Sequence, residues 1–130
     1  MILIETHIWV WWVQGDPRLT GLQDAFLAAH ESTGIGVSTI TLWEVAKLVE
    51  HGRLTLPTAI EEWYNVALKY PGIQLVDLSP AIAAESTRLP GQFHADPADQ
   101  IIVATSRVLR CPLVSSDGRI RRYEHVVHGP

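Results

Sequence analysis

Two kinds of hydrophobic pattern alternate along this chain of 130 residues. Short apolar runs without polar alternation, such as residues 1–4 and 35–37, are typical of strands buried on both faces of a parallel sheet. Between these runs, apolar residues recur every three or four positions, which is the spacing of a helix with one buried face. Because the two patterns alternate throughout, the sequence predicts an α/β fold with a mostly parallel central sheet flanked by helices.

Helix starts and turns divide the chain into predicted elements. The expected strands are residues 1–4, 35–37, 73–78 and 112–115, with a weak last strand near 125–127. The expected helices follow Thr6 and then span residues 19–29, 39–51, 58–70, 79–89 and 97–109. Thr6 is the expected cap of the first helix, and Thr58 with Glu61 forms an expected capping box. The second helix is expected to bury one apolar face made of Leu22, Ala25, Phe26 and Ala29.

Composition indicates one compact domain over residues 1–130, since 47% of the residues are hydrophobic and 18% are charged. Cys111 is the single cysteine, which excludes an internal disulfide and a cysteine-rich zinc site and favours a cytoplasmic location. The apolar start is interrupted by Glu5 and His7 and lacks a basic leader, so we expect it to be core and not a signal peptide or membrane span.

A net charge of −4 argues against a generic nucleic-acid binder, unless acidic residues gather around divalent cations. Four acids are placed for such a cluster. Glu5 and Asp117 follow predicted strands, and Glu44 and Asp99 lie near the starts of predicted helices. In parallel sheets, ligands collect at the carboxyl ends of the strands, and oxygen-only ligands favour Mg²⁺ or Mn²⁺.

Each acid also has a purely structural interpretation. Asp96 and Asp99 would cap the helix that starts at Pro97, Asp117 would be the polar corner of a turn, and Glu5 and Glu44 would be solvated. For any one acid this interpretation is the simpler one. Four acids expected at one edge of the sheet favour a metal site.

Four segments carry a family resemblance: ETHIWVWW, STITLWEVAKL, HADPADQIIVATS and LVSSDGRI. Their residues, order and spacing resemble the signature segments of PIN-domain ribonucleases, and most of all the VapC toxins of bacterial toxin–antitoxin pairs. The resemblance implies a parallel sheet between helices, a Mg²⁺ or Mn²⁺ site, and hydrolysis of single-stranded or structured RNA such as tRNA. It also implies a cognate VapB-type antitoxin that covers the site.

The resemblance assigns roles residue by residue. The family's catalytic acids fall on Glu5, Glu44, Asp99 and Asp117. The expected metal ligands are Glu5, Asp96, Asp99 and Asp117, with Glu44 as a ligand or as the base that orients water. The residues expected to contact the substrate are Thr6, Ser115, Ser116 and Arg119.

Two residues depart from the family pattern. Glu5 stands where the family has Asp, and Gln100 stands where a subgroup has Arg. The extra methylene of Glu5 displaces its carboxylate by about 1.5 Å, and Mg²⁺ requires near-ideal geometry, so we expect attenuated activity. The sequence leaves open whether Glu5 is a natural variant or an introduced change, and whether the chain acts through partner binding only.

The remaining candidates are weaker. A receiver-like signalling module would need a lysine after a late strand, and neither Lys47 nor Lys69 is so placed. The histidines at 7, 94 and 125 lack zinc-ligand spacing, and Trp9, Trp12, Trp43 and Trp63 are expected in the core, with Trp11 facing outward. Arg119, Arg121 and Arg122 are expected to be a solvated face that could guide a phosphate backbone. The apolar, Trp-rich first helices predict a homodimer.

Overall fold

A computed structural model describes residues 1–130, which form a four-stranded sheet and seven helices. The strands are β1 (Ile2–Ile4), β2 (Ile35–Ser38), β3 (Ile73–Val76) and β4 (Leu113–Val114). The helices are α1 (Thr6–Gln14), α2 (Gly21–Ala29), α3 (Thr39–Glu50), α4 (Ile60–Ala67), α5 (Pro80–Ser86), α6 (Pro97–Leu109) and α7 (Gly118–Arg121). None of these helices is both long enough and apolar enough to span a membrane.

The sheet is parallel throughout, with strand order β3-β2-β1-β4. β1 pairs with β2 through Ile2 and Ile35 and with β4 through Ile4 and Val114, so β1 is bonded on both sides. All three residues of β1 are fully buried, as its unbroken apolar run predicts. The predicted α/β fold with a mostly parallel sheet is confirmed. Because every strand runs the same way, the residues that follow the strands lie at one edge.

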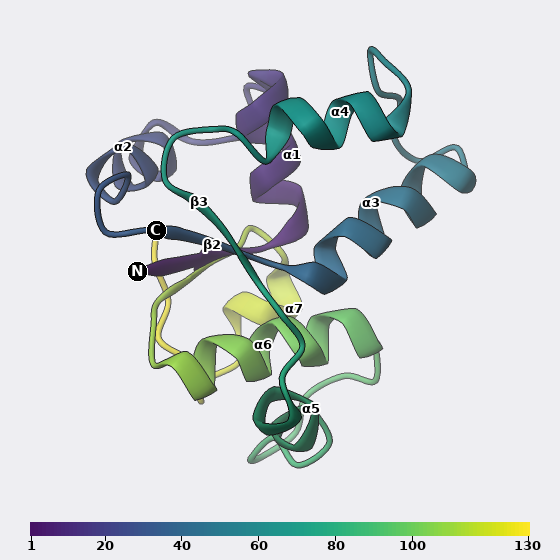
Figure 1. Ribbon diagram of the computed structural model, residues 1–130. Helices are drawn as coiled ribbons and strands as arrows, with labels where there is room; N and C mark the ends of the chain where they lie inside the picture. Colours follow the sequence, from purple (N-terminus) through teal and green to yellow (C-terminus); the bar gives the residue numbers. More distant parts are fainter.

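The two faces of the sheet are covered by different helices (Figure 1). Side chains of a strand alternate between faces, so Ile2 and Ile4 point to one side and Leu3 to the other. The first side packs against α1, α2, α3 and α4. The second side packs against α6 and α7. The acids at the strand ends therefore lie between two helical layers.

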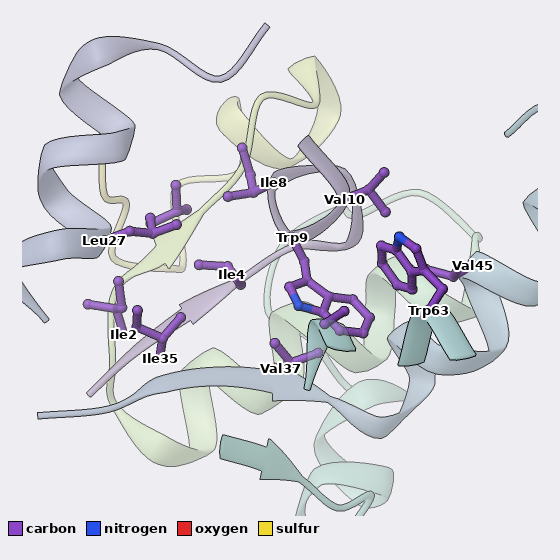
Figure 2. Close-up of a cluster of buried hydrophobic side chains, with 12 residues drawn as sticks. Ile2, Ile4, Ile8, Trp9, Val10, Leu27, Ile35, Val37, Val45 and Trp63 are labelled. Carbon is purple, nitrogen blue, oxygen red and sulfur yellow. The ribbon is translucent and has the colours of Figure 1, made fainter. Parts of the chain in front are cut away.

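Trp9 is the largest fully buried side chain of the first layer and packs edge-on against Trp63, with ring centroids 4.9 Å apart (Figure 2). This contact joins α1 to α4, and Val37 of β2 lies in the same cluster. Trp12 likewise packs edge-on against Tyr70. The apolar side chains of α1 are thus packed in the chain's own core, so α1 gives no reason to expect a dimer.

Several sequence expectations about element ends are wrong. Glu5, not Thr6, caps α1, because the Glu5 carboxylate accepts the backbone N–H of His7. The cap of α4 is Ala59 without a side-chain bond, since the Thr58 hydroxyl bonds to the Ala59 carbonyl instead. α4 ends at Ala67 and α5 at Ser86, each three residues early. The weak last strand is a single bridge between Leu113 and His128.

Two expectations about buried faces are also wrong. α2 buries Gln23 and Leu27, whereas Leu22 is 76% exposed. The Gln23 side chain closes a capping box with Thr20 and donates to Ser116, so a polar residue takes a buried position on this helix. Trp43 is 52% exposed, because α3 buries Thr41 and Val45.

Candidate functional site

Acidic residues gather at the edge formed by the strand ends. Glu5 follows β1 directly, Asp117 follows β4, and Glu44 lies in α3 just after β2. Asp96 and Asp99 lie at the start of α6, which packs on the opposite face. The parallel sheet therefore brings acids from distant parts of the chain to one edge. We refer to these five acids together as the rim.

Three of these acids converge most closely. One carboxylate oxygen each of Glu44, Asp96 and Asp99 lies within 4.8 Å of the other two. Asp96 caps α6 by accepting the Asp99 backbone N–H at 3.1 Å, which fixes the two side chains relative to each other. The capping role expected of Asp96 is thus present, and it coexists with the cluster. We refer to Glu44, Asp96 and Asp99 as the acid cluster.

Asp99 carries the strongest electrostatic signature of the rim. Burial, together with the negative charges of Asp96, Glu44, Asp117 and Glu5, raises the pKa of Asp99 to about 7. Its Oδ2 atom lies 3.0 Å from His94 Nε2 in an orientation that makes no hydrogen bond. His94 Nδ1 accepts the Asp96 N–H at 3.3 Å, which assigns the ring proton to Nε2, facing Asp99. A positive charge arriving here would favour ionised Asp99.

Glu44 is positioned by two hydroxyl groups. The Thr6 hydroxyl donates to Glu44 Oε1 and lies 3.0 Å from the Thr41 hydroxyl. Burial raises the pKa of Glu44, the Thr6 hydrogen bond opposes this rise, and the charges of Glu5 and Asp96 add to it. Thr6 is 1% exposed, so its hydroxyl faces Glu44 and not the solvent. The structure thus gives Thr6 a contact with an acid, and its contact with the substrate stays a prediction.

Glu5 is directed toward α1 and not toward the acid cluster. Its Oε1 accepts the His7 N–H at 2.8 Å, and its Oε2 lies 3.3 Å from His7 Nδ1. This side-chain contact is the main reason why the pKa of His7 is raised, with burial acting against it. The charge of Glu5 still raises the pKa values of Asp99 and Glu44. The charge of Glu5 therefore acts on Asp99 and Glu44, while the Glu5 carboxylate itself contacts His7.

Asp117 forms the other end of the rim. Its Oδ1 accepts the backbone N–H groups of Arg119 and Ile120 at the start of α7. Burial raises the pKa of Asp117, but these two bonds and the Arg119 charge outweigh it, so the pKa lies below its usual range. Arg119 is 3.7 Å from Asp117 and 3.8 Å from Asp99, so its guanidinium bridges the two acids.

The two serines before Asp117 are used differently. Ser115 is buried and its Oγ accepts the Asp117 N–H at 3.0 Å. Ser116 is exposed and its Oγ accepts from Gln23 of α2. Ser115 therefore shapes the loop that carries Asp117, and Ser116 ties this loop to the first helical layer.

Three further residues have supporting roles that the sequence did not indicate. Thr41 faces Thr6 and Glu44, and Gln23 contacts Ser116 from 93 residues away. Gln100 donates to the His94 carbonyl at 3.0 Å and so fixes the loop before α6. Gln23 and Thr41 are polar residues on the apolar stripes of their helices. This was the only feature of the sequence that could have indicated their roles. Their partners lie elsewhere in the chain, so the sequence could not name the contacts.

The donor set of the acid cluster fits a hard divalent cation. It offers carboxylate oxygens only, and oxygen donors are the ligands that Mg²⁺ and Mn²⁺ prefer. Burial and the neighbouring negative charges both raise the pKa of Asp99, and a bound cation would offset both effects. Cys111, the single cysteine, is not part of the acid cluster, because it is buried in the second hydrophobic core cluster.

The PIN domain family model matches residues 2–126. The chain belongs to the PIN-domain family. This PIN domain is 30% identical over 124 residues to Ribonuclease VapC22 of Mycobacterium tuberculosis (strain ATCC 25618 / H37Rv), and the alignment covers 95% of this chain and 92% of that protein. The resemblance inferred from the four sequence segments is therefore confirmed.

Solved structures share the fold of this PIN domain. VapBC2 from Rickettsia felis, bound to a DNA fragment from its promoter, matches with a TM-score of 0.72 at 16% identity over 99% of this chain and 98% of that chain. FitAcB from Neisseria gonorrhoeae matches with a TM-score of 0.67 at 20% identity over 100% and 98%. A toxin–antitoxin complex from Klebsiella pneumoniae matches with a TM-score of 0.64 at 22% identity over 98% and 96%.

Proposed function

We propose that this PIN domain is a VapC-type toxin, a metal-dependent endoribonuclease that cleaves single-stranded or structured RNA. The convergence of Glu44, Asp96 and Asp99 at the carboxyl edge of the sheet is the observation that carries this proposal. The 30% identity to Ribonuclease VapC22 supports RNA as the substrate. We further propose a VapB-type antitoxin as partner, in line with the toxin–antitoxin complex among the structural neighbours. The homodimer stays a prediction from the sequence, which light scattering would test.

The acid cluster would hold Mg²⁺ or Mn²⁺, with Asp117 and Glu5 as the further acids of the rim. A bound divalent ion supplies positive charge that favours both formation of the hydrolytic nucleophile and the charge that develops on the phosphate. The chain's own contribution is positioning. Thr6 orients Glu44, Asp96 fixes the start of α6, and Ser115 fixes Asp117. Arg119 lies where it can contact a phosphate once that group approaches Asp117.

One observation favours a second candidate, in which the protein acts through partner binding with little catalysis. The Glu5 carboxylate is engaged by His7, and no oxygen of Glu5 joins the three acids that converge. Cleavage by wild type beside Glu5→Asp separates the two candidates. A nuclease cleaves RNA with Glu5 in place, whereas a protein that acts through partner binding cleaves RNA measurably only after Glu5→Asp, or not at all.

The proposed nuclease is tested by conservative removal of single carboxylates. Asp99→Asn, Asp117→Asn and Glu44→Gln should each lower Mn²⁺-dependent cleavage of tRNA or single-stranded RNA by at least about 10²-fold, because each removes negative charge that would hold the divalent cation. Asp77→Asn is the matched control. Asp77 also follows a strand at this edge of the sheet, but it is exposed and lies outside the acid cluster.

Gel electrophoresis of labelled RNA, with EDTA-treated samples beside Mn²⁺ and Mg²⁺, gives the cleavage rates. Circular dichroism confirms that each variant is folded. Cleavage that survives both Asp99→Asn and Asp117→Asn would show that the site is wrongly assigned. Cleavage in EDTA would show that the reaction needs no divalent ion.

A further inference from the structure

A hollow of about 320 Å³ opens beside the acid cluster, between the loop that precedes α6 and the end of α7. Its volume is at the lower end of the range for small-molecule sites. Cationic and aromatic side chains form most of its lining, among them Arg119, Arg122, Phe93 and His125. The acid cluster next to it is made of carboxylates, so the two neighbouring sites differ in charge.

Two residues belong both to the hollow and to the rim of acids. His94 lines the hollow and places Nε2 3.0 Å from Asp99 Oδ2. Arg119 lines it too, and its guanidinium reaches Asp99 and Asp117 at 3.8 and 3.7 Å. A chain of nucleotides with one phosphate at Asp99 would therefore place an adjoining nucleotide at the hollow.

Arg122 is the cationic side chain of the hollow that has no bonding partner in the protein. It makes no ion pair within 4 Å and no side-chain hydrogen bond, and it is exposed. Its Nη1 atom lies 3.0 Å from where a Cβ of Gly118 would stand, so the absence of a side chain at 118 lets the guanidinium lie along the start of α7. Arg121, one residue earlier, instead donates to the Gly129 carbonyl and does not line the hollow.

Aromatic rings make the opposite wall. Phe93 packs against His94 and edge-on against Tyr123, at 4.4 and 4.9 Å between ring centroids. Tyr123 is held in place by donating its hydroxyl hydrogen to the Pro90 carbonyl at 2.6 Å. The His125 ring approaches Gly91, where a Cβ would lie 3.1 Å from Nε2 and the φ of +66° favours glycine. This wall is rigid, and its rings offer surfaces on which a base can stack.

We infer that this hollow binds the nucleotide next to the scissile phosphate, with its phosphate on Arg119 and Arg122 and its base against Phe93 and His125. The inference rests on the proposed ribonuclease function and adds a subsite to it. Glu124 is the one acid of the lining, and it lies 3.5 Å from His125 Nε2. Its side chain is 84% exposed, so it can turn away from an arriving phosphate.

The subsite is tested on the full chain with a pair of neighbouring variants. Arg122→Gln should raise KM for RNA cleavage roughly tenfold and leave kcat within about twofold, because it removes a phosphate contact outside the acid rim. Arg121→Gln should leave both unchanged. Phe93→Leu should raise KM to a similar extent by removing a stacking surface while keeping an apolar side chain. Thermal unfolding of each variant verifies the fold.

A second readout is independent of cleavage. Adenosine and uridine 5′-monophosphate, added in EDTA, should shift the backbone amide NMR signals of Gly91 and Gly118 in wild type and in Arg121→Gln, but not in Arg122→Gln. Inorganic phosphate should bind more weakly than either nucleotide. Phosphate binding as tight as nucleotide binding, or equal behaviour of the two arginine variants, would overturn the inference.

The two readouts separate this subsite from the proposed function. If wild type cleaves RNA and Arg122→Gln keeps the same KM, the subsite is wrong and the nuclease stands. If wild type cleaves no RNA but nucleotides bind in an Arg122-dependent way, the nuclease is wrong and the hollow remains a nucleotide site.

Discussion

The Glu5 carboxylate lies at the start of the first helix and does not join the acid cluster. Glu5 follows a strand that is hydrogen-bonded on both sides, so the backbone cannot retreat to bring the longer side chain into register with the acid cluster. The side chain bends instead toward the N-terminus of α1, where it accepts the His7 N–H and lies near the His7 ring. A negative charge is favourable at a helix start, so this arrangement is stable.

Glu5→Asp should therefore increase Mn²⁺- or Mg²⁺-dependent RNA cleavage by roughly tenfold or more, because a shift of about 1 Å at a reacting group costs up to ~10²-fold. Aspartate is also a good helix cap, so the free energy of unfolding should change little. A fluorescent-RNA assay and calorimetry of Mn²⁺ binding on both proteins measure the effect. Glu44→Asp is the control and should lose activity, since it breaks the bond to Thr6. Equal activity of wild type and Glu5→Asp would show that the site tolerates the longer acid.

Asp99 links the rim to the stability of the fold. Its pKa is about 7 in the folded protein and near 3.8 in the unfolded chain, so the folded state binds the proton more tightly. Without metal, the free energy of unfolding should fall as the pH rises from about 4 to 7 and level off above. Asp99→Asn should remove this slope and stabilise the protein at pH 8 by a few kcal/mol. Urea unfolding at pH 5 and pH 8 in EDTA measures it, and an unchanged slope in Asp99→Asn would contradict the assignment.

At the scale of helices and strands, local patterns could predict most of the elements, but they missed α7 (Gly118–Arg121) and did not predict how each element ends. The unbroken run of β1 and the spacing of apolar residues in α6 are properties of the sequence alone, and both elements are present. The cap of α1 depends on where the Glu5 side chain turns, and the buried face of α2 depends on Gln23 reaching Ser116. The Gln23 contact crosses the fold, so a local pattern does not contain it, whereas the Glu5 cap is a local bond that depends on the side-chain rotamer of Glu5.

The site follows the same division. The parallel order of elements places Glu44, Asp99 and Asp117 at one edge, and this placement could be predicted from strand ends alone. The orientation of the side chains at this edge could not be predicted from the strand ends. Thr6 faces Glu44 because β1 and β2 are neighbours, and Arg119 faces Asp99 because α7 follows β4 beside α6. These contacts depend on pairing between elements that are 20 to 40 residues apart.

For the whole molecule, charge sets what can approach the rim. The chain carries a net charge of −4, and the negative charges of the neighbouring acids add to the raised pKa values of Glu44 and Asp99. A polyanion such as RNA is repelled there unless a cation intervenes. A protein partner that supplies Arg or Lys would satisfy the same charge, so metal and antitoxin should compete for one place.

A cognate VapB-type antitoxin that lays an Arg or Lys over the rim should ionise Asp99, because a nearby positive charge favours the carboxylate. At pH 7 Asp99 is about half protonated, so binding should release roughly half a proton per toxin chain. Calorimetric titrations in two buffers of different ionisation enthalpy measure this release, and light scattering counts the chains in the complex. Asp99→Asn should bind the antitoxin without the release, and Mn²⁺ should weaken binding to wild type but not to Asp99→Asn. Equal proton release by both proteins would place the antitoxin away from the rim.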